Sequence, residues 1–174
     1  MRWRTQPKQV LFICTGNYYR SRFAEALFNH LGQARGLRWR AFSRGLAIHL
    51  ATGDLSPFAL AELERRKIPL DRTAPTRMPL TQADLRAARR AIALREAEHR
   101  PMVQHCFPRW TRRIEYWDIG DVDDSTPEDT FAAIERQVTA LIEDLEKPGP
   151  LRTALQKVLR RRRIPESRAS LAAR

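Results

Sequence analysis

The residues best suited to do chemistry lie in the stretch FICTGNYYRSR, at positions 12–22. Cys14 ends a short apolar run, and Arg20 follows it six positions later, directly before Ser21. A thiolate is a strong nucleophile, and the planar guanidinium group of an arginine can bind two oxygens of a phosphate at once. A cysteine and an arginine at this spacing therefore predict a nucleophile beside a bound tetrahedral anion.

The segments on either side of this stretch favour the same interpretation. Residues 9–13, QVLFI, are typical of a short buried strand, and from Ser21 onward apolar residues recur at helical spacing. A loop between a parallel strand and a helix lies at the carboxyl edge of the sheet, where its backbone N–H groups and the helix N-terminus can bind an anion. The same electric field favours the thiolate form of Cys14. The loop residues expected to bind the anion are Thr15, Gly16, Asn17, Tyr18 and Tyr19.

Further along the chain, predicted strands alternate with predicted helices. Strands are expected at 9–13, 37–43, 90–94 and 114–119. Helices are expected after Ser21, Ser56, Thr81 and Thr126, and the last of them carries the longest apolar stripe. Residues 69–80 contain several prolines and are expected to form a long loop. The alternation predicts an α/β fold, a three-layer sandwich with a four-stranded, mostly parallel sheet and helices on both faces.

The composition fits one soluble domain. The chain has 174 residues, of which 43% are hydrophobic and 30% charged, and no apolar run is long enough to cross a membrane. Its two cysteines, Cys14 and Cys106, are expected to be reduced thiols, and the histidines stand singly, without zinc-ligand spacing. We therefore expect a cytoplasmic protein that needs neither a metal nor another cofactor.

The net charge of +12 is concentrated near the C-terminus. Residues 151–174 carry eight Lys or Arg and one Glu, which gives this segment a net charge of +7. The sequence EKPGPL, at 146–151, has the prolines and glycine of a linker. We expect a domain over residues 1–147 and a basic tail, 148–174, that either forms a short helix or is disordered and that can bind acidic partners.

The stretch VLFICTGNYYRSRFAEALFNHL resembles the N-terminal signature of the low-molecular-weight protein tyrosine phosphatase family, Cys-x-Gly-Asn-x-Cys-Arg-Ser-Pro-x-Ala-Glu. The matching residues are Cys14, Gly16, Asn17, Arg20, Ser21, Ala24 and Glu25. Shorter matches follow at FSRGL (42–46), LTQADL (80–85) and EHR (98–100), so the resemblance covers residues 9–146. It implies the fold of that family and a phosphomonoester hydrolase activity.

The resemblance also implies a role for each residue of the loop. Cys14 is the nucleophile that forms a phosphocysteine, Arg20 binds the phosphoryl oxygens, and Ser21 stabilises the thiolate. Asn17 holds the loop in shape through a hydrogen bond to Ser43. The substrate is a phosphorylated protein or a small phosphate ester, and phosphate-like anions bind in the same site.

The general acid implied by the resemblance is an aspartate before the last helix. The segment YWDIGDVDD offers four candidates, Asp118, Asp121, Asp123 and Asp124. Asp121 matches the family's Asp-Pro pair best, with Val122 in place of the proline. Its role would be to protonate the leaving oxygen and then to activate water.

Several positions depart from the family pattern. Tyr18 and Tyr19 stand where the family usually has a small or aliphatic residue and a cysteine, and either could form a wall beside the substrate. Arg22 replaces the family's proline, and we expect it to add positive charge at the mouth of the site. Asp123 and Asp124 replace tyrosines that flank a phosphotyrosine ring in the family, which leaves the substrate class open.

Two other functions remain open from the sequence. An arsenate reductase that uses a small external thiol needs only Cys14, whereas one coupled to thioredoxin needs two further cysteines, and only Cys106 is present. The other alternative is a non-catalytic module that binds anions or nucleic acid, with Arg160–Arg163 contacting phosphates.

Overall fold

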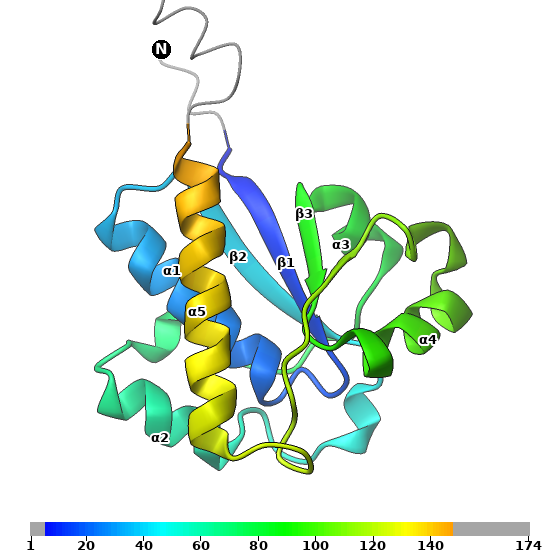
Figure 1. Ribbon diagram of the computed structural model, residues 1–174, viewed down its shortest axis with the longest axis horizontal. Coiled ribbons are helices and arrows are strands. Elements are labelled where there is room, and N and C mark those ends of the chain that lie inside the picture. The colour runs from blue at the N-terminus through cyan, green and yellow to red at the C-terminus, as the bar shows by residue number, and fades with distance from the viewer. Residues whose placement is uncertain (1–5, 148–174) are drawn as a thin grey trace, which may run out of the picture. The chain divides into compact units, whose positions relative to one another are not determined.

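The computed structural model describes residues 6–147, and its four strands form one sheet (Figure 1). The strands are β1 (Lys8–Cys14), β2 (Trp39–Gly45), β3 (Arg90–Ala93) and β4 (Glu115–Tyr116). They are all parallel and lie in the order β2-β1-β3-β4. The predicted four-stranded parallel sheet is confirmed, although β4 is shorter than the segment 114–119 that the sequence suggested.

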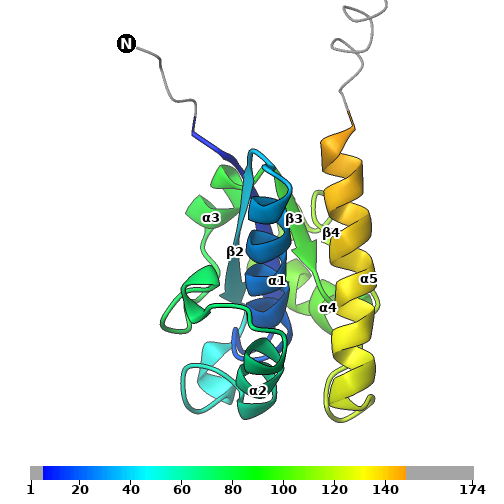
Figure 2. The same cartoon turned by 90° about the vertical axis from the view of Figure 1, so that its left-hand side faces the viewer.

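Helices cover both faces of this sheet, as expected. The α-helices of the described residues are α1 (Arg20–Ala34), α2 (Pro57–Arg65), α3 (Gln82–Ala87), α4 (Glu96–Cys106) and α5 (Pro127–Glu146). Short 3-10 helices are η1 (Ile48–Leu50), η2 (Leu70–Arg72) and η3 (Pro108–Trp110). Figure 2 shows α1 and α3 on opposite sides of the sheet, with α5 beside α1. This is the predicted three-layer α/β architecture.

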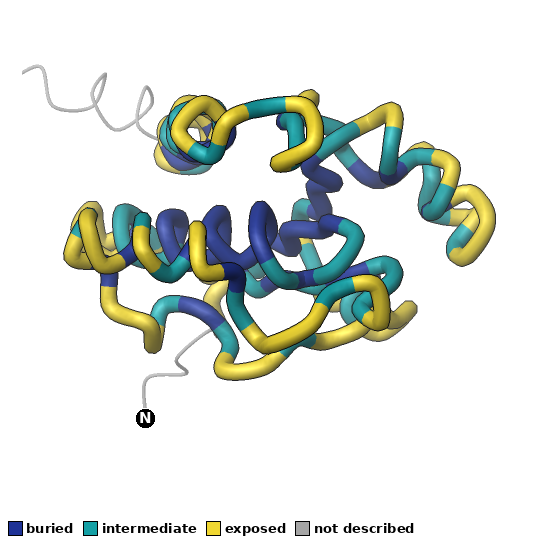
Figure 3. Tube along the Cα trace, turned by 90° about the horizontal axis from the view of Figure 1, so that it is seen from below, coloured by how far each residue is buried: buried dark blue, intermediate teal, exposed yellow. Residues whose placement is uncertain are grey.

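Strand β1 is the centre of the hydrophobic core, because it is buried on both faces. Leu11 and Ile13 pack with Leu85 of α3 and Val103 of α4 on one face. On the other face, the ring of Phe12 lies 6.1 Å from the ring of Phe28 in α1. Figure 3 shows buried residues along the strands and the inner turns of the helices. Such two-sided burial explains why this strand reads as an unbroken apolar run.

Helix α4 was not predicted from the sequence. Pro101 lies inside it, and only His99 and Val103 among its residues are buried, so the segment shows little helical periodicity. The predicted loop 69–80 was correct apart from the short helix η2. The missed helix matters for function, because its first turn reaches the candidate site.

The chain divides into two units, residues 1–142 and 143–174. The sheet and the candidate site belong to the first unit, and the structure describes only residues 143–147 of the second. The predicted basic tail, 148–174, lies outside the described residues. Within residues 6–147, no helix is both long and apolar enough to cross a membrane.

The end of β2 approaches the loop after β1 at Gly45. A Cβ atom on Gly45 would lie 2.8 Å from the carbonyl oxygen of Thr15 and 2.9 Å from the backbone nitrogen of Asn17. Both are backbone atoms, which cannot move aside as a flexible side chain can. A glycine is therefore required here for the loop to pack against β2.

We expect Gly45→Ala to lower the free energy of unfolding by about 2–3 kcal/mol, because the new methyl group overpacks rigid backbone. Denaturant unfolding measures this change. Gly32→Ala is the matched control, since a Cβ there would lie 3.5 Å from its nearest neighbour, in Leu37, and helix propensity favours alanine. Equal stability of the two variants would contradict the close approach at Gly45.

Candidate active site

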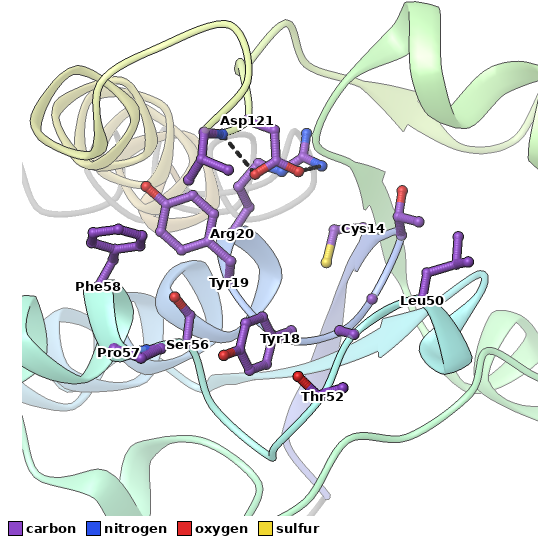
Figure 4. A pocket seen from close by; sticks show the side chains of 14 residues that line it. Cys14, Tyr18, Tyr19, Arg20, Leu50, Thr52, Ser56, Pro57, Phe58 and Asp121 are labelled. Carbon is purple, nitrogen blue, oxygen red and sulfur yellow. Dashed lines mark hydrogen bonds and ion pairs between the residues drawn. The ribbon is translucent and has the colours of Figure 1, made fainter.

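The loop between β1 and α1 forms the floor of a cavity of about 380 Å³. Cys14, at the end of β1, and Arg20, at the start of α1, both line this cavity, and Figure 4 shows the Cys14 sulfur pointing into it. Cys14 is 3% exposed. The predicted residues Thr15, Gly16, Tyr18, Tyr19 and Asp121 also line it. The spacing of six residues therefore brings the thiol and the guanidinium group into one cavity.

The backbone of this loop is suited to bind an anion. Within residues 6–147, none of the backbone N–H groups of residues 15–20 donates a hydrogen bond to a protein acceptor. Buried N–H groups in proteins nearly always have a partner. A run of unpaired N–H groups at a helix N-terminus next to Cys14 is the arrangement that a phosphate group satisfies.

Asn17 holds the loop in this shape from beneath. It is fully buried, and its φ angle of 50° lies in the left-handed region that asparagine tolerates. Its Nδ2 donates to Ser43 Oγ at 2.8 Å and to Ser21 Oγ at 3.1 Å, and its Oδ1 accepts from the backbone N–H of Met78 at 2.8 Å. The hydrogen bond expected between Asn17 and Ser43 is thus present. The Asn17 side chain does not line the cavity, so only its backbone could contact a substrate.

Buried hydroxyl groups, joined through the Asn17 amide, lead from the thiol into the protein. The Ser21 hydroxyl lies 2.9 Å from the Cys14 sulfur, as the assignment of Ser21 requires. Beyond it, Ser43 donates to Glu25 at 2.7 Å, and Thr73 donates to the same carboxylate oxygen at 2.8 Å. Burial raises the pKa of Glu25, although these two hydrogen bonds act in the opposite direction.

Arg20 is held by two carboxylates at once. Its Nη1 and Nη2 donate to the two oxygens of Glu98 at 2.9 and 3.0 Å, and Nη2 also donates to Asp121 at 2.6 Å. Nη1 further donates to the carbonyl oxygen of Ile119 at 3.3 Å. Burial acts to lower the pKa of Arg20, but the contacts with Glu98 and the charges of Cys14 and Asp121 outweigh it and raise the pKa.

Glu98 was not among the residues predicted for the site, although the match EHR includes it. It lies in the first turn of α4 and accepts a hydrogen bond from the Thr15 hydroxyl as well as from Arg20. Partial burial acts to raise the pKa of Glu98, but its contacts with His99 and Arg20 outweigh burial and hold the pKa well below the usual range. Glu98 becomes a neighbour of Arg20 only because α4 packs against the loop, a contact that the sequence does not show.

The loop before α5 brings one of the four candidate aspartates into the cavity. Asp121 lines the cavity and pairs with Arg20, whereas Asp118, Asp123 and Asp124 are exposed and do not line it. Asp124 instead forms an ion pair with Arg95, at the start of α4. Of the four candidate aspartates, Asp121 is therefore the one whose side chain can reach a ligand in the cavity.

The two loop tyrosines lie differently. Tyr18 is partly exposed, and Figure 4 shows its ring at the cavity wall near Thr52. Tyr19 is 6% exposed and packs edge-on against Phe131 of α5, with ring centres 5.3 Å apart. Burial raises the pKa of the Tyr19 hydroxyl to about 12. Tyr18 is therefore the tyrosine that offers more of its surface to a substrate.

The mouth of the cavity is apolar. Leu50, Phe58 and Val122 line it and are 68%, 52% and 48% exposed. They come from η1, from the first turn of α2 and from the loop before α5. Sequence reasoning did not find these residues, because single exposed apolar residues in separate segments carry no pattern.

The expectation that Arg22 adds positive charge at the mouth was wrong. Arg22 is 1% exposed and does not line the cavity. Its guanidinium group donates to the hydroxyl of Thr73 at 2.7 Å and to the carbonyl oxygens of Asp54, at 2.8 Å, and Ala74. The side chain thus ties α1 to the segments around it, and burial lowers its pKa.

Within residues 6–147, no group of three or more His, Cys, Asp or Glu residues is arranged to hold a metal ion. Cys106 is an exposed free thiol at the end of α4, and it does not line the cavity that contains Cys14.

Asn17→Ala should lower the free energy of unfolding by about 2–4 kcal/mol and weaken the binding of inorganic phosphate, because it removes three hydrogen bonds from beneath the loop. Denaturant unfolding and calorimetric titration measure the two effects. Asn29→Ala is the control, since Asn29 also makes three hydrogen bonds, to Ala41 and Arg72, away from the cavity. Asn29→Ala should lose stability only; an equal loss of phosphate affinity would contradict the role of Asn17.

Comparison with known proteins agrees with this geometry. The model of the family described as low molecular weight phosphotyrosine protein phosphatase matches residues 9–151. A protein-arginine-phosphatase from Bacillus subtilis is 29% identical over 105 residues, which are 60% of this chain and 67% of that protein.

Solved structures show the same fold. A crystal structure of a YwlE mutant from Bacillus subtilis superposes with a TM-score of 0.68 at 25% identity, over 80% of this chain and 99% of that one. A low molecular weight protein tyrosine phosphatase from T. tengcongensis superposes with a TM-score of 0.64 at 25% identity, over 79% and 97% of the two chains. The chain is therefore a phosphatase that belongs to the low molecular weight phosphotyrosine protein phosphatase family.

Proposed function

We propose that this protein hydrolyses phosphate monoesters through a phosphocysteine intermediate on Cys14. The observation that carries this proposal is the run of N–H groups directly after Cys14 that have no protein acceptor within residues 6–147, with Cys14 and Arg20 lining the same cavity. These groups can stabilise the negative charge on three phosphoryl oxygens during transfer. No cofactor takes part in this mechanism.

In the first step, the Cys14 thiolate attacks phosphorus in line with the leaving oxygen. The S–P bond forms while the P–O bond to the alcohol or phenol breaks, and the electron pair of that bond stays with the oxygen. Asp121, in its acid form, gives this oxygen a proton. The Ser21 hydroxyl, 2.9 Å from the sulfur, stabilises the thiolate before the attack and as the leaving group in the second step.

In the second step, water replaces the thiolate on phosphorus. Asp121, now a carboxylate, takes a proton from the water molecule while the water oxygen bonds to phosphorus. The S–P bond breaks and its electron pair returns to Cys14. Inorganic phosphate leaves, and both residues are back in their starting states.

The cavity favours a phosphorylated side chain of a protein as the substrate. The apolar mouth formed by Leu50, Phe58 and Val122 suits the carbon part of such a side chain, while the phosphate group reaches the loop. The relative from Bacillus subtilis is named for phosphorylated arginine and the family for phosphotyrosine, so both are candidates. Phosphotyrosine is a phosphate monoester and fits the steps above. In phosphoarginine, a phosphoramidate, the P–N bond would break instead and the leaving nitrogen would take the proton. Because the reaction needs a reduced thiol, we place it in a reducing compartment such as the cytoplasm.

Cys14→Ser should lower the hydrolysis of para-nitrophenyl phosphate by roughly 10³-fold or more, because it removes the nucleophile. The assay contains EDTA, to exclude contaminating metal-dependent phosphatases. Cys106→Ser, which replaces the other cysteine, should keep full activity. Activity that survives in Cys14→Ser would remove Cys14 from the mechanism, and thiol-dependent reduction of arsenate without phosphatase activity would identify an arsenate reductase instead.

Asp121→Asn should lower kcat by about 10²–10⁴-fold, because the leaving oxygen loses its proton donor. The loss should be larger for phenyl phosphate than for para-nitrophenyl phosphate, whose leaving group needs less protonation. Asp123→Asn, two residues away and exposed, is the control and should keep its kcat. If Asp118→Asn alone caused the loss, the wrong aspartate would have been assigned.

A further inference from the structure

We propose that Glu98 is the positioning residue that fixes the orientation of Arg20 for phosphoryl transfer. The inference rests on the proposed function, and it concerns a residue of α4 outside the loop, the acid and the cavity lining. Glu98 would act through Arg20 and would not touch the substrate itself.

The hydrogen bonds of Arg20 show which edge of its guanidinium group is available. An arginine has five N–H bonds, one on Nε and two on each terminal nitrogen. Glu98 takes one from each terminal nitrogen, the Ile119 carbonyl takes the second on Nη1, and Asp121 takes the second on Nη2. Within the described residues, Nε–H alone has no acceptor.

This pattern leaves one edge for a phosphate. The Nε–H and the outer N–H of Nη2 point the same way and form the fork that binds two oxygens of a tetrahedral anion. Glu98 binds the end of the guanidinium group formed by Nη1 and Nη2, through the other N–H of Nη2, and so leaves the fork open. Asp121 contacts the fork at Nη2, so an entering phosphoryl oxygen would take over this N–H and release Asp121 toward the leaving group.

Glu98 is itself firmly held. The Thr15 hydroxyl donates to the carboxylate oxygen that Nη2 contacts, and Nε2 of His99 lies 3.3 Å from the same oxygen. His99 is fully buried, and its Nδ1 accepts a hydrogen bond from the backbone N–H of Arg95 at 2.9 Å, which fixes the ring. The carboxylate is therefore an anchor with little freedom of its own.

The chemistry needs this anchor because Arg20 has two possible carboxylate partners. Without Glu98, Asp121 would be the remaining carboxylate on the guanidinium group, and the proton donor would be drawn to Arg20 instead of the leaving oxygen. A displacement of about 1 Å at a positioning group can cost 10²-fold in rate. We therefore expect the loss to fall mainly on kcat.

The test compares Glu98→Gln, which keeps the shape and removes the charge, with Glu98→Asp, which keeps the charge. Glu96→Gln is the matched control, because Glu96 lies in the same turn of α4 and pairs with Arg100 at 2.8 Å. Turnover of para-nitrophenyl phosphate gives kcat and KM, calorimetric titration gives the affinity for inorganic phosphate, and thermal unfolding gives Tm.

Glu98→Gln should lower kcat by about 10- to 100-fold and weaken phosphate binding at least about threefold, with a smaller change in KM than in kcat. Glu98→Asp should recover most of the loss, and Glu96→Gln should behave as wild type. A purely structural contact would lower Tm and leave kcat and phosphate affinity unchanged, which would overturn the proposal. Tighter phosphate binding by Glu98→Gln would also overturn the proposal. It would show that the Glu98 charge only repels the phosphate and does not position Arg20.

The two proposals can fail separately. If the wild-type protein releases no phosphate from its substrates, the proposed hydrolase is wrong, but the titration with inorganic phosphate still tests whether Glu98 orders Arg20. If Glu98→Gln does not fold, Glu98→Ala replaces it in the comparison, and wild-type kcat and phosphate affinity in that variant would overturn the proposal.

Discussion

The buried guanidinium group of Arg20 is the interaction on which the site depends. It joins three segments that are far apart in the sequence: the loop after β1, the first turn of α4 through Glu98, and the loop before α5 through Asp121. A buried cation is stable only when it is paired and hydrogen-bonded. Arg20 and its neighbours are therefore fixed together when the sheet and its helices fold.

The loop after β1 also carries an electrostatic cost. Its N–H groups have no protein acceptor within the described residues, an arrangement that costs free energy unless an anion or water satisfies them. Asn17 maintains this loop from beneath by bonding to Ser43 and to the backbone of Met78. The hydrogen bonds of this buried side chain thus hold the loop N–H groups in place before a ligand binds. Such fixed donors are the basis of electrostatic preorganisation.

Helix α4 has a larger part in the site than its sequence suggests. Glu98 in its first turn contacts Arg20, and Arg95 just before it pairs with Asp124 in the loop that carries Asp121. One short segment therefore contacts both Arg20 and the loop that carries Asp121. The exposed pair of Arg95 and Asp124 is the weaker of these two contacts, since solvent screens it.

The sequence alone determined the loop after β1 and the positions of Cys14 and Arg20 on it, because these depend on residues that are neighbours along the chain. It also indicated the four strands, because hydrophobic periodicity is local, and their alternation with helices predicted a parallel sheet. Periodicity and the spacing within residues 12–22 carry that information. Helix α4, the buried position of Arg22 and the contact of Glu98 with Arg20 were decided only by the tertiary structure. These features arise from residues more than 30 positions apart, or from a helix with few buried residues. No local pattern records such contacts, because they form only when the layers pack against the sheet.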